Sequence, residues 1–64
     1  MLSNNVYNLL EQIVEESKSL WRIKQRYKQD AGAFGDCLTF WNKLEMDEEQ
    51  HISDLKILIK SHLE

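Results

Sequence analysis

The sequence predicts an all-α fold, a two-helix antiparallel hairpin that pairs with a second copy into a four-helix bundle. The chain has 64 residues and no proline, and its two glycines, Gly32 and Gly35, lie close together near the middle. The sequence on both sides of them is rich in Leu, Ile, Glu, Gln and Lys, most of which favour helix. We therefore expect two helices and one break, in a single domain over residues 1–64.

The first helix is predicted at about residues 4–29, where Ser3 or Asn4 can cap the first turn. A turn over residues 30–35 contains both glycines. The second helix is predicted at about residues 36–61, and Asp36 can cap it by accepting a bond from a first-turn amide. Each helix would be roughly 39 Å long. Helices of matched length joined by a short turn pack antiparallel.

Apolar residues in both helices recur at alternating steps of three and four, which is the spacing of a packed seam in a helical bundle. In the first helix the seam is Val6, Leu9, Ile13, Glu16, Leu20, Ile23 and Tyr27. In the second helix it is Cys37, Trp41, Leu44, Glu48, His51, Leu55, Leu58 and His62. Flanking residues widen the two apolar faces: Leu10, Val14 and Trp21 in the first helix, and Phe40, Ile52 and Ile59 in the second. We interpret Trp21, Tyr27, Phe40 and Trp41 as core aromatics.

One hairpin cannot cover this much apolar surface, so the excess predicts a homo-oligomer, a dimer at least. A chain this short needs disulfides, a metal or a partner, and Cys37 alone cannot form an internal disulfide. The net charge of −3 does not favour binding to nucleic acid or to an anionic membrane. No apolar run approaches the roughly 20 residues of a membrane span. No secretion signal is recognisable, so we expect a cytoplasmic protein.

Three polar residues, Glu16, Glu48 and His51, interrupt the middle of the two seams. Glu16 lies 17 residues before Ala33, at the centre of the turn, and Glu48 and His51 lie 15 and 18 residues after it. At 1.5 Å per residue, the three side chains are at nearly the same height in the hairpin. If two hairpins pair about a twofold axis, four glutamates and two histidines converge. Because buried carboxylates need compensation, this set predicts a dinuclear metal site.

The ligand types and the spacing indicate which metal would bind. Glu48 and His51 are three residues apart and share one helical face. Four carboxylates balance two divalent cations, and oxygen ligands with one imidazole per metal favour iron or manganese. Zinc also fits the general order of affinities. Glu15 is adjacent to Glu16 but lies on a polar face, so Glu16 is the better candidate for a ligand.

The order Glu16 followed by Glu48-x-x-His51 resembles half of a ferritin-like di-iron bundle. The stretch from Phe40 to His51, FWNKLEMDEEQH, is similar to the second helix of rubrerythrin-type proteins. A single set of ligands in two helices is also similar to the encapsulated ferritins, which build their site between subunits. The resemblance implies a ferritin-like four-helix bundle, two iron ions per dimer, and reaction of Fe(II) with oxygen or peroxide.

The sequence also departs from these families. Rubrerythrins carry a rubredoxin module with paired cysteines, which Cys37 alone cannot supply, so peroxide reduction would require an external electron donor. Cage-forming ferritins have longer subunits, so storage in a self-made shell is not implied. Two other functions fit the same residues. One is a non-catalytic helical dimerisation module whose polar seam sets the register, and the other is metal binding without turnover. His62, near the end of the second helix, is interpreted as a surface residue.

Overall fold

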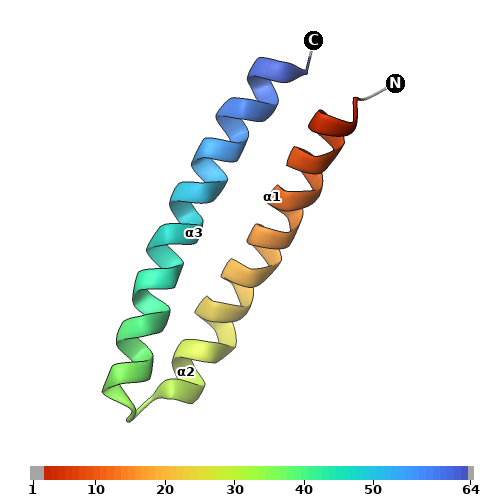
Figure 1. Cartoon of the computed structure of the whole chain (residues 1–64). Coiled ribbons are helices and arrows are strands. Elements are labelled where there is room, and N and C mark those ends of the chain that lie inside the picture. Colours follow the sequence, from red (N-terminus) through yellow and green to blue (C-terminus); the bar gives the residue numbers. More distant parts are fainter. Residues whose placement is uncertain (1–2, 64) are drawn as a thin grey trace.

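The computed structural model describes residues 3–63, which form two helical rods joined by one tight turn (Figure 1). In the first rod, α1 spans Asn4–Arg22, a π-helical segment (η1) spans Ile23–Tyr27, and α2 spans Lys28–Ala31. The second rod is α3, Gly35–His62. The prediction of an all-helical chain with two helices is confirmed. Pairing with a second copy remains a prediction.

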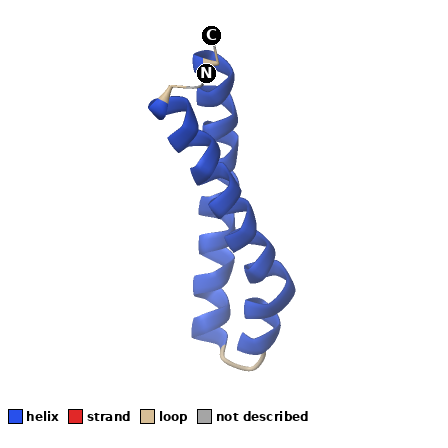
Figure 2. Cartoon of the chain, turned by 90° about the vertical axis from the view of Figure 1, so that its right-hand side faces the viewer, coloured by secondary structure: helices blue, strands red, loops and turns tan. Residues whose placement is uncertain are grey.

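The two rods lie side by side and antiparallel, so that the start of α1 and the end of α3 are at the same end of the hairpin (Figure 1). Seen from the side, the rods cross one another (Figure 2). The molecule measures 48 × 15 × 13 Å, which is the shape of a single layer of two helices. Within the described residues, neither rod has an apolar stretch long enough to cross a membrane.

The beginning of each rod shows which capping residue is used. Ser3 caps α1 as predicted, because its hydroxyl oxygen accepts a hydrogen bond from the Val6 amide at 3.1 Å. The second helix begins one residue earlier than predicted, with Phe34 in the capping position. Asp36 therefore lies inside the first turn, where its carboxylate accepts a bond from the Cys37 amide at 2.9 Å. Its negative charge still complements the positive end of the helix dipole.

The turn is shorter than the predicted 30–35, because the first rod remains helical through Ala31. Gly32 ends it with a φ of 34°, a left-handed conformation that glycine adopts readily. The Gly32 amide donates to the Lys28 carbonyl at 3.2 Å, and the Phe34 amide donates to the Ala31 carbonyl. These two bonds satisfy carbonyls at the helix end and reverse the chain within three residues.

The π-helical segment was not predicted. The Lys28 amide donates to the carbonyl of Ile23, five residues earlier, so the turn holds one residue more than an α-helical turn. The inserted residue keeps the first rod in contact with α3: Ile23 is fully buried, Ala31 is buried, and between them Tyr27 packs on Trp41 with ring centroids 4.8 Å apart. An unbroken α-helix would have turned the side chain of Ala31 away from this line.

A single hairpin buries few apolar side chains. Among the described residues only Val6, Ile23 and Ala31 are both apolar and buried. Trp21 and Phe40, which the sequence predicts as core aromatics, are 55% and 57% exposed. Cys37, a predicted seam residue, is also exposed. These predictions are wrong for the isolated chain, because two helices contact each other along a single line and leave the flanks of both apolar faces open.

Replacement of the fully buried Ile23 by alanine removes contacts that no other side chain can make. We expect Ile23→Ala to lower the free energy of unfolding by about 2 to 5 kcal/mol in urea denaturation at fixed protein concentration. Ile57→Ala is the matched control, because Ile57 is 65% exposed on α3; it should change the free energy by no more than about 0.5 kcal/mol. Equal effects of the two substitutions would contradict this packing.

Candidate metal centre

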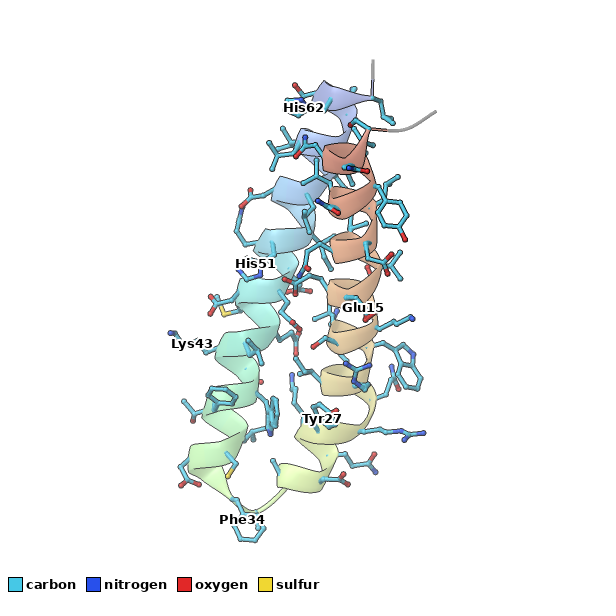
Figure 3. All side chains as sticks on the ribbon, turned by 45° about the vertical axis from the view of Figure 1, so that its right-hand side comes forward. Glu15, Tyr27, Phe34, Lys43, His51 and His62 are labelled. Carbon is cyan, nitrogen blue, oxygen red and sulfur yellow. The ribbon has the colours of Figure 1, made fainter. Side chains whose placement is uncertain are left out.

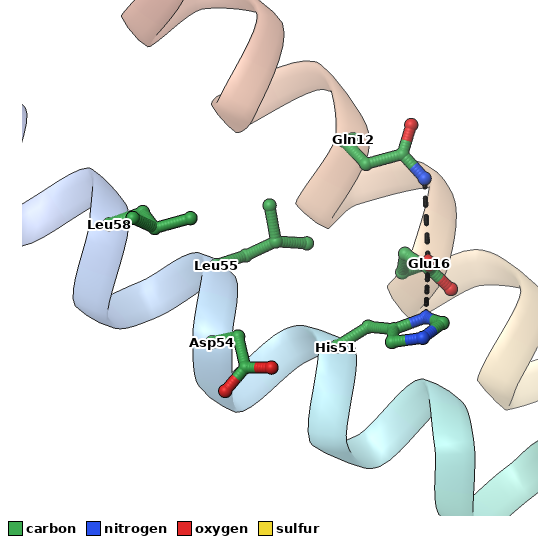
Figure 4. Close-up of a pocket in the computed structure, with 6 residues that line it drawn as sticks. All are labelled: Gln12, Glu16, His51, Asp54, Leu55 and Leu58. Carbon is green, nitrogen blue, oxygen red and sulfur yellow. Dashed lines mark hydrogen bonds and ion pairs between the residues drawn. The ribbon is translucent and has the colours of Figure 1, made fainter.

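Glu16, Glu48 and His51 lie together near the middle of the hairpin, at the common height that the sequence predicts. Glu16 comes from α1, whereas Glu48 and His51 come from consecutive turns of α3. Nδ1 of His51 is 2.9 Å from Oε1 of Glu16, which links the two helices (Figure 4). The geometry therefore joins two residues that are 35 positions apart in the sequence.

Glu48 is the buried member of the three, with 8% of its surface exposed. It is the only buried charged residue among the described residues. Its Oε1 atom has no hydrogen-bond partner in the part of the chain that the structure describes. A buried carboxylate oxygen without a partner costs free energy, because it has lost water and gained nothing in return. This oxygen therefore requires a further partner, such as a proton or a cation.

The two carboxyl groups have pKa values that shift in opposite directions. Burial, followed by the neighbouring Glu16 carboxyl, raises the pKa of Glu48 above its usual value of 4.5. Burial also acts to raise the pKa of Glu16, but its interactions with Glu48, His51 and Gln12 outweigh this effect and lower the pKa. In the metal-free hairpin, Glu16 is therefore the charged member of the pair, and Glu48 holds a proton more readily.

His51 lies at the edge of the site, where half of its side chain is exposed, and not in the buried seam that the sequence predicts. It borders an open hollow of about 240 Å³, which is lined by Gln12, Glu16, His51, Asp54, Leu55 and Leu58 (Figure 4). Because Nδ1 of the ring contacts Glu16, the tautomer with a proton on Nδ1 leaves the lone pair of Nε2 free. Neutral imidazole in this state is the form that binds metals.

Some residues around the site were missed by the sequence reasoning. Gln12 donates from Nε2 to Oε1 of Glu16 at 3.4 Å, and Ser19 lowers the pKa of Glu48. Asp54 lines the hollow and accepts a bond from Gln50 at 2.9 Å. Gln12 could have been found, because it is four residues before Glu16, and residues at this spacing are neighbours on a helix. The same argument applies to Ser19 and Asp54, which follow Glu16 and His51 by three residues.

Three other glutamates and the second histidine are engaged or placed away from this cluster. Glu45 pairs with Lys28 at 2.8 Å and Glu49 pairs with Lys24 at 3.1 Å, so both glutamates link the two rods through ion pairs. Glu15 is exposed and lies 3.9 Å from Lys18, which supports Glu16 as the candidate ligand. His62 is exposed at the open end of the hairpin, well apart from His51 (Figure 3).

The described residues of one hairpin do not form a complete metal site. Within residues 3–63, no group of three or more His, Cys, Asp and Glu side chains is placed to hold a metal ion by itself. The donor atoms that are present are nevertheless suitable, because carboxylate oxygens and a neutral imidazole are ligands of divalent iron, manganese and zinc. The partnerless Oε1 of Glu48 and the open hollow beside His51 leave room for further ligands.

Comparisons with known proteins found no match, whether among protein-family models, curated proteins or solved structures.

The raised pKa of Glu48 predicts a specific pH dependence of stability in metal-free protein. The stability associated with Glu48 is fully present below its unfolded value of about 4.5 and is lost as the pH rises through the raised folded value. We therefore expect Glu48→Gln to match the wild type near pH 4 and to become progressively more stable than the wild type toward pH 7. Glu16 acts in the opposite sense, because its lowered pKa gives stability above 4.5 that is lost at lower pH.

Urea denaturation in the presence of a chelator, repeated across this pH range, measures the difference. Glu15→Gln is the control, because Glu15 is exposed one position from Glu16 and should show no such trend. If Glu48→Gln is less stable than the wild type at pH 7 without metal, the buried negative charge of Glu48 does not destabilise the hairpin, and the interpretation is wrong.

Proposed function

We propose that two copies of the hairpin pair across the open hollow and hold two divalent metal ions, preferably iron, between Glu16, Glu48 and His51 of each copy. The function is then that of a ferritin-like di-iron protein that oxidises Fe(II) with oxygen or peroxide. The observation that carries this proposal is the buried, partnerless Oε1 of Glu48 beside a second carboxyl group. A cation is the partner that allows both carboxyl groups to be ionised while buried.

The surface area of the chain supports pairing. One copy exposes 5053 Å², whereas a compact monomer of 7.6 kDa is expected to expose roughly 4300 Å². The excess of roughly 750 Å² is close to the ~800 Å² that each partner buries in a standard protein–protein interface. Leu55 and Leu58 in the hollow offer an apolar surface beside the polar ligands, and Leu58 is 44% exposed. A second hairpin over the hollow would cover both.

Pairing also completes the set of ligands. Each copy contributes two carboxylates and one imidazole, so a dimer contributes four carboxylates and two imidazoles. The four negative charges are neutralised by two divalent cations. Ferritin-like sites built from two Glu and two Glu-x-x-His segments have the same composition.

Bound iron would supply the electron transfer to the oxidant, and the chain's own residues position and neutralise the ions. Gln12 holds the Glu16 carboxylate by a hydrogen bond, and Glu16 in turn fixes the ring of His51. This leaves Nε2 of His51 as the nitrogen that can ligate. Leu55 and Leu58 would limit the access of water once a second copy covers the hollow. Complete reduction of peroxide would still require an external electron donor.

A second function, a non-catalytic helical dimerisation module, is favoured by a different observation. The contact between Glu16 and His51 already satisfies part of the polar seam within one chain. A polar group in a seam can set the register of helices without any metal. In this case no metal would bind beside Glu48, and apolar contacts would hold the interface. Binding of metal without turnover is the intermediate case.

Metal loading separates these functions. We expect protein loaded with Fe(II) without oxygen and then desalted to retain about two iron ions per dimer. We also expect the metal to raise the melting temperature, because binding to the folded state alone stabilises it. Glu48→Ala should remove both effects, whereas Glu15→Ala, which alters an exposed neighbour of Glu16, should retain them. Elemental analysis and thermal melts provide the two readings.

If the metal content of the wild type is at background and Glu48→Ala leaves stability unchanged or higher, the dimerisation module is the correct function. If iron binds, exposure to oxygen or peroxide distinguishes an enzyme from a passive binder. Oxidation of bound Fe(II) faster than of free Fe(II) under the same conditions indicates an enzyme.

A further inference from the structure

A second cluster of side chains lies on α1 and η1, outside the candidate metal centre. Lys18, Trp21, Arg22 and Arg26 line an open hollow of about 330 Å³, and we call these four residues the Trp21 ridge. None of them lines the hollow beside His51. Trp21 is 55% exposed, which is unusual for so large an aromatic side chain. Residues 17–29 hold five cationic side chains and no acidic one, in a chain with a net charge of −3.

The ridge continues from the last turn of α1 into η1. Trp21 lies in α1 and Arg26 lies in η1. The guanidinium carbon of Arg26 is 5.9 Å from the centre of the Trp21 ring, a cation–π distance. The ridge therefore places a guanidinium group over an indole ring that is 55% exposed.

The cationic side chains of the ridge have fewer acidic partners than the other cationic side chains of residues 17–29. Lys24 and Lys28 form ion pairs with Glu49 and Glu45 on α3. Within residues 3–63, neither Arg22 nor Arg26 has an ion pair, and Lys18 has only a long contact of 3.9 Å with Glu15. Two guanidinium groups are therefore available to a ligand at the surface. Each can bind a carboxylate through two parallel hydrogen bonds.

We propose that the Trp21 ridge docks an acidic segment of a partner protein. Carboxylates of the segment would bind Arg22, Arg26 and Lys18, and an apolar side chain of the segment would pack on Trp21. Trp and Arg are the residue types that most often carry the free energy of protein–protein binding. Opposite charges at the rim also speed the encounter, as is typical of small, transient interfaces.

Charge and shape favour a polypeptide over a nucleic acid. The chain as a whole is acidic, so a long polyanion is repelled by most of its surface, whereas a short acidic segment meets only the ridge. Proteins that bind single-stranded nucleic acid provide several aromatic platforms for successive bases. The ridge provides only Trp21. The proposal does not depend on the metal centre, because the two hollows share no residue.

The test uses a fluorescein-labelled peptide of alternating Glu and Asp with one central Leu, titrated with the protein at low salt. We expect saturable binding, followed by fluorescence anisotropy. We expect Arg22→Gln with Arg26→Gln to weaken the binding by about tenfold or more, and Trp21→Ala to weaken it by a similar factor. Lys43→Gln with Lys56→Gln is the matched control, because these two exposed lysines lie on α3 and their loss changes the net charge equally.

The control pair should change the dissociation constant by less than about twofold. Helix content by circular dichroism verifies that each variant is folded, and glutamine at exposed helical positions preserves helix. The proposal is overturned by the absence of saturable binding, by equal losses in the two pairs, or by retention of binding in Trp21→Ala. Tighter binding of a twelve-residue oligothymidylate than of the peptide would overturn it in favour of a nucleic-acid ligand.

Discussion

The carboxyl groups of Glu48 and Glu16 interact inside the hairpin, and this interaction opposes the ionisation of Glu48. In the part of the chain that the structure describes, the buried apolar residues are only Val6, Ile23 and Ala31, and so small a core has little free energy to offset a buried negative charge. In the isolated chain, burial and the neighbouring Glu16 carboxyl raise the pKa of Glu48. A bound cation would interact with the same carboxylate oxygens while they remain ionised. The free energy of metal binding would then add to the stability of the folded state.

The shape of the molecule leaves the candidate site open on one side. Two rods in one layer cannot enclose a site, and His51 is left at the edge of an open hollow. In the proposed dimer, a second copy of the hairpin supplies the other edge of this hollow. The proposed pairing would cover Leu55 and Leu58 in the same step that brings further ligands to the polar residues.

The sequence predicts those features that depend on regular helix geometry. The rise per residue places Glu16, Glu48 and His51 at one height, and the structure brings them together. The sequence does not predict the π-helical segment. That segment depends on contacts of Ile23, Tyr27 and Ala31 with α3, and the local sequence of the first rod carries no information about these contacts. The exposure of Trp21 and the edge position of His51 were missed for a related reason. A seam identifies the residues that face a neighbour, but not how far around each helix that neighbour extends.

Native mass spectrometry of protein loaded with Fe(II) under nitrogen tests the central claim most directly, because it counts chains and metal ions in the same particle. The proposed dimer with a shared metal site predicts a species with twice the 7.6 kDa chain mass that carries two iron ions. It also predicts that monomers, where present, carry no iron. Iron bound stoichiometrically to monomers, or dimers that remain free of metal at saturating Fe(II), would contradict the account.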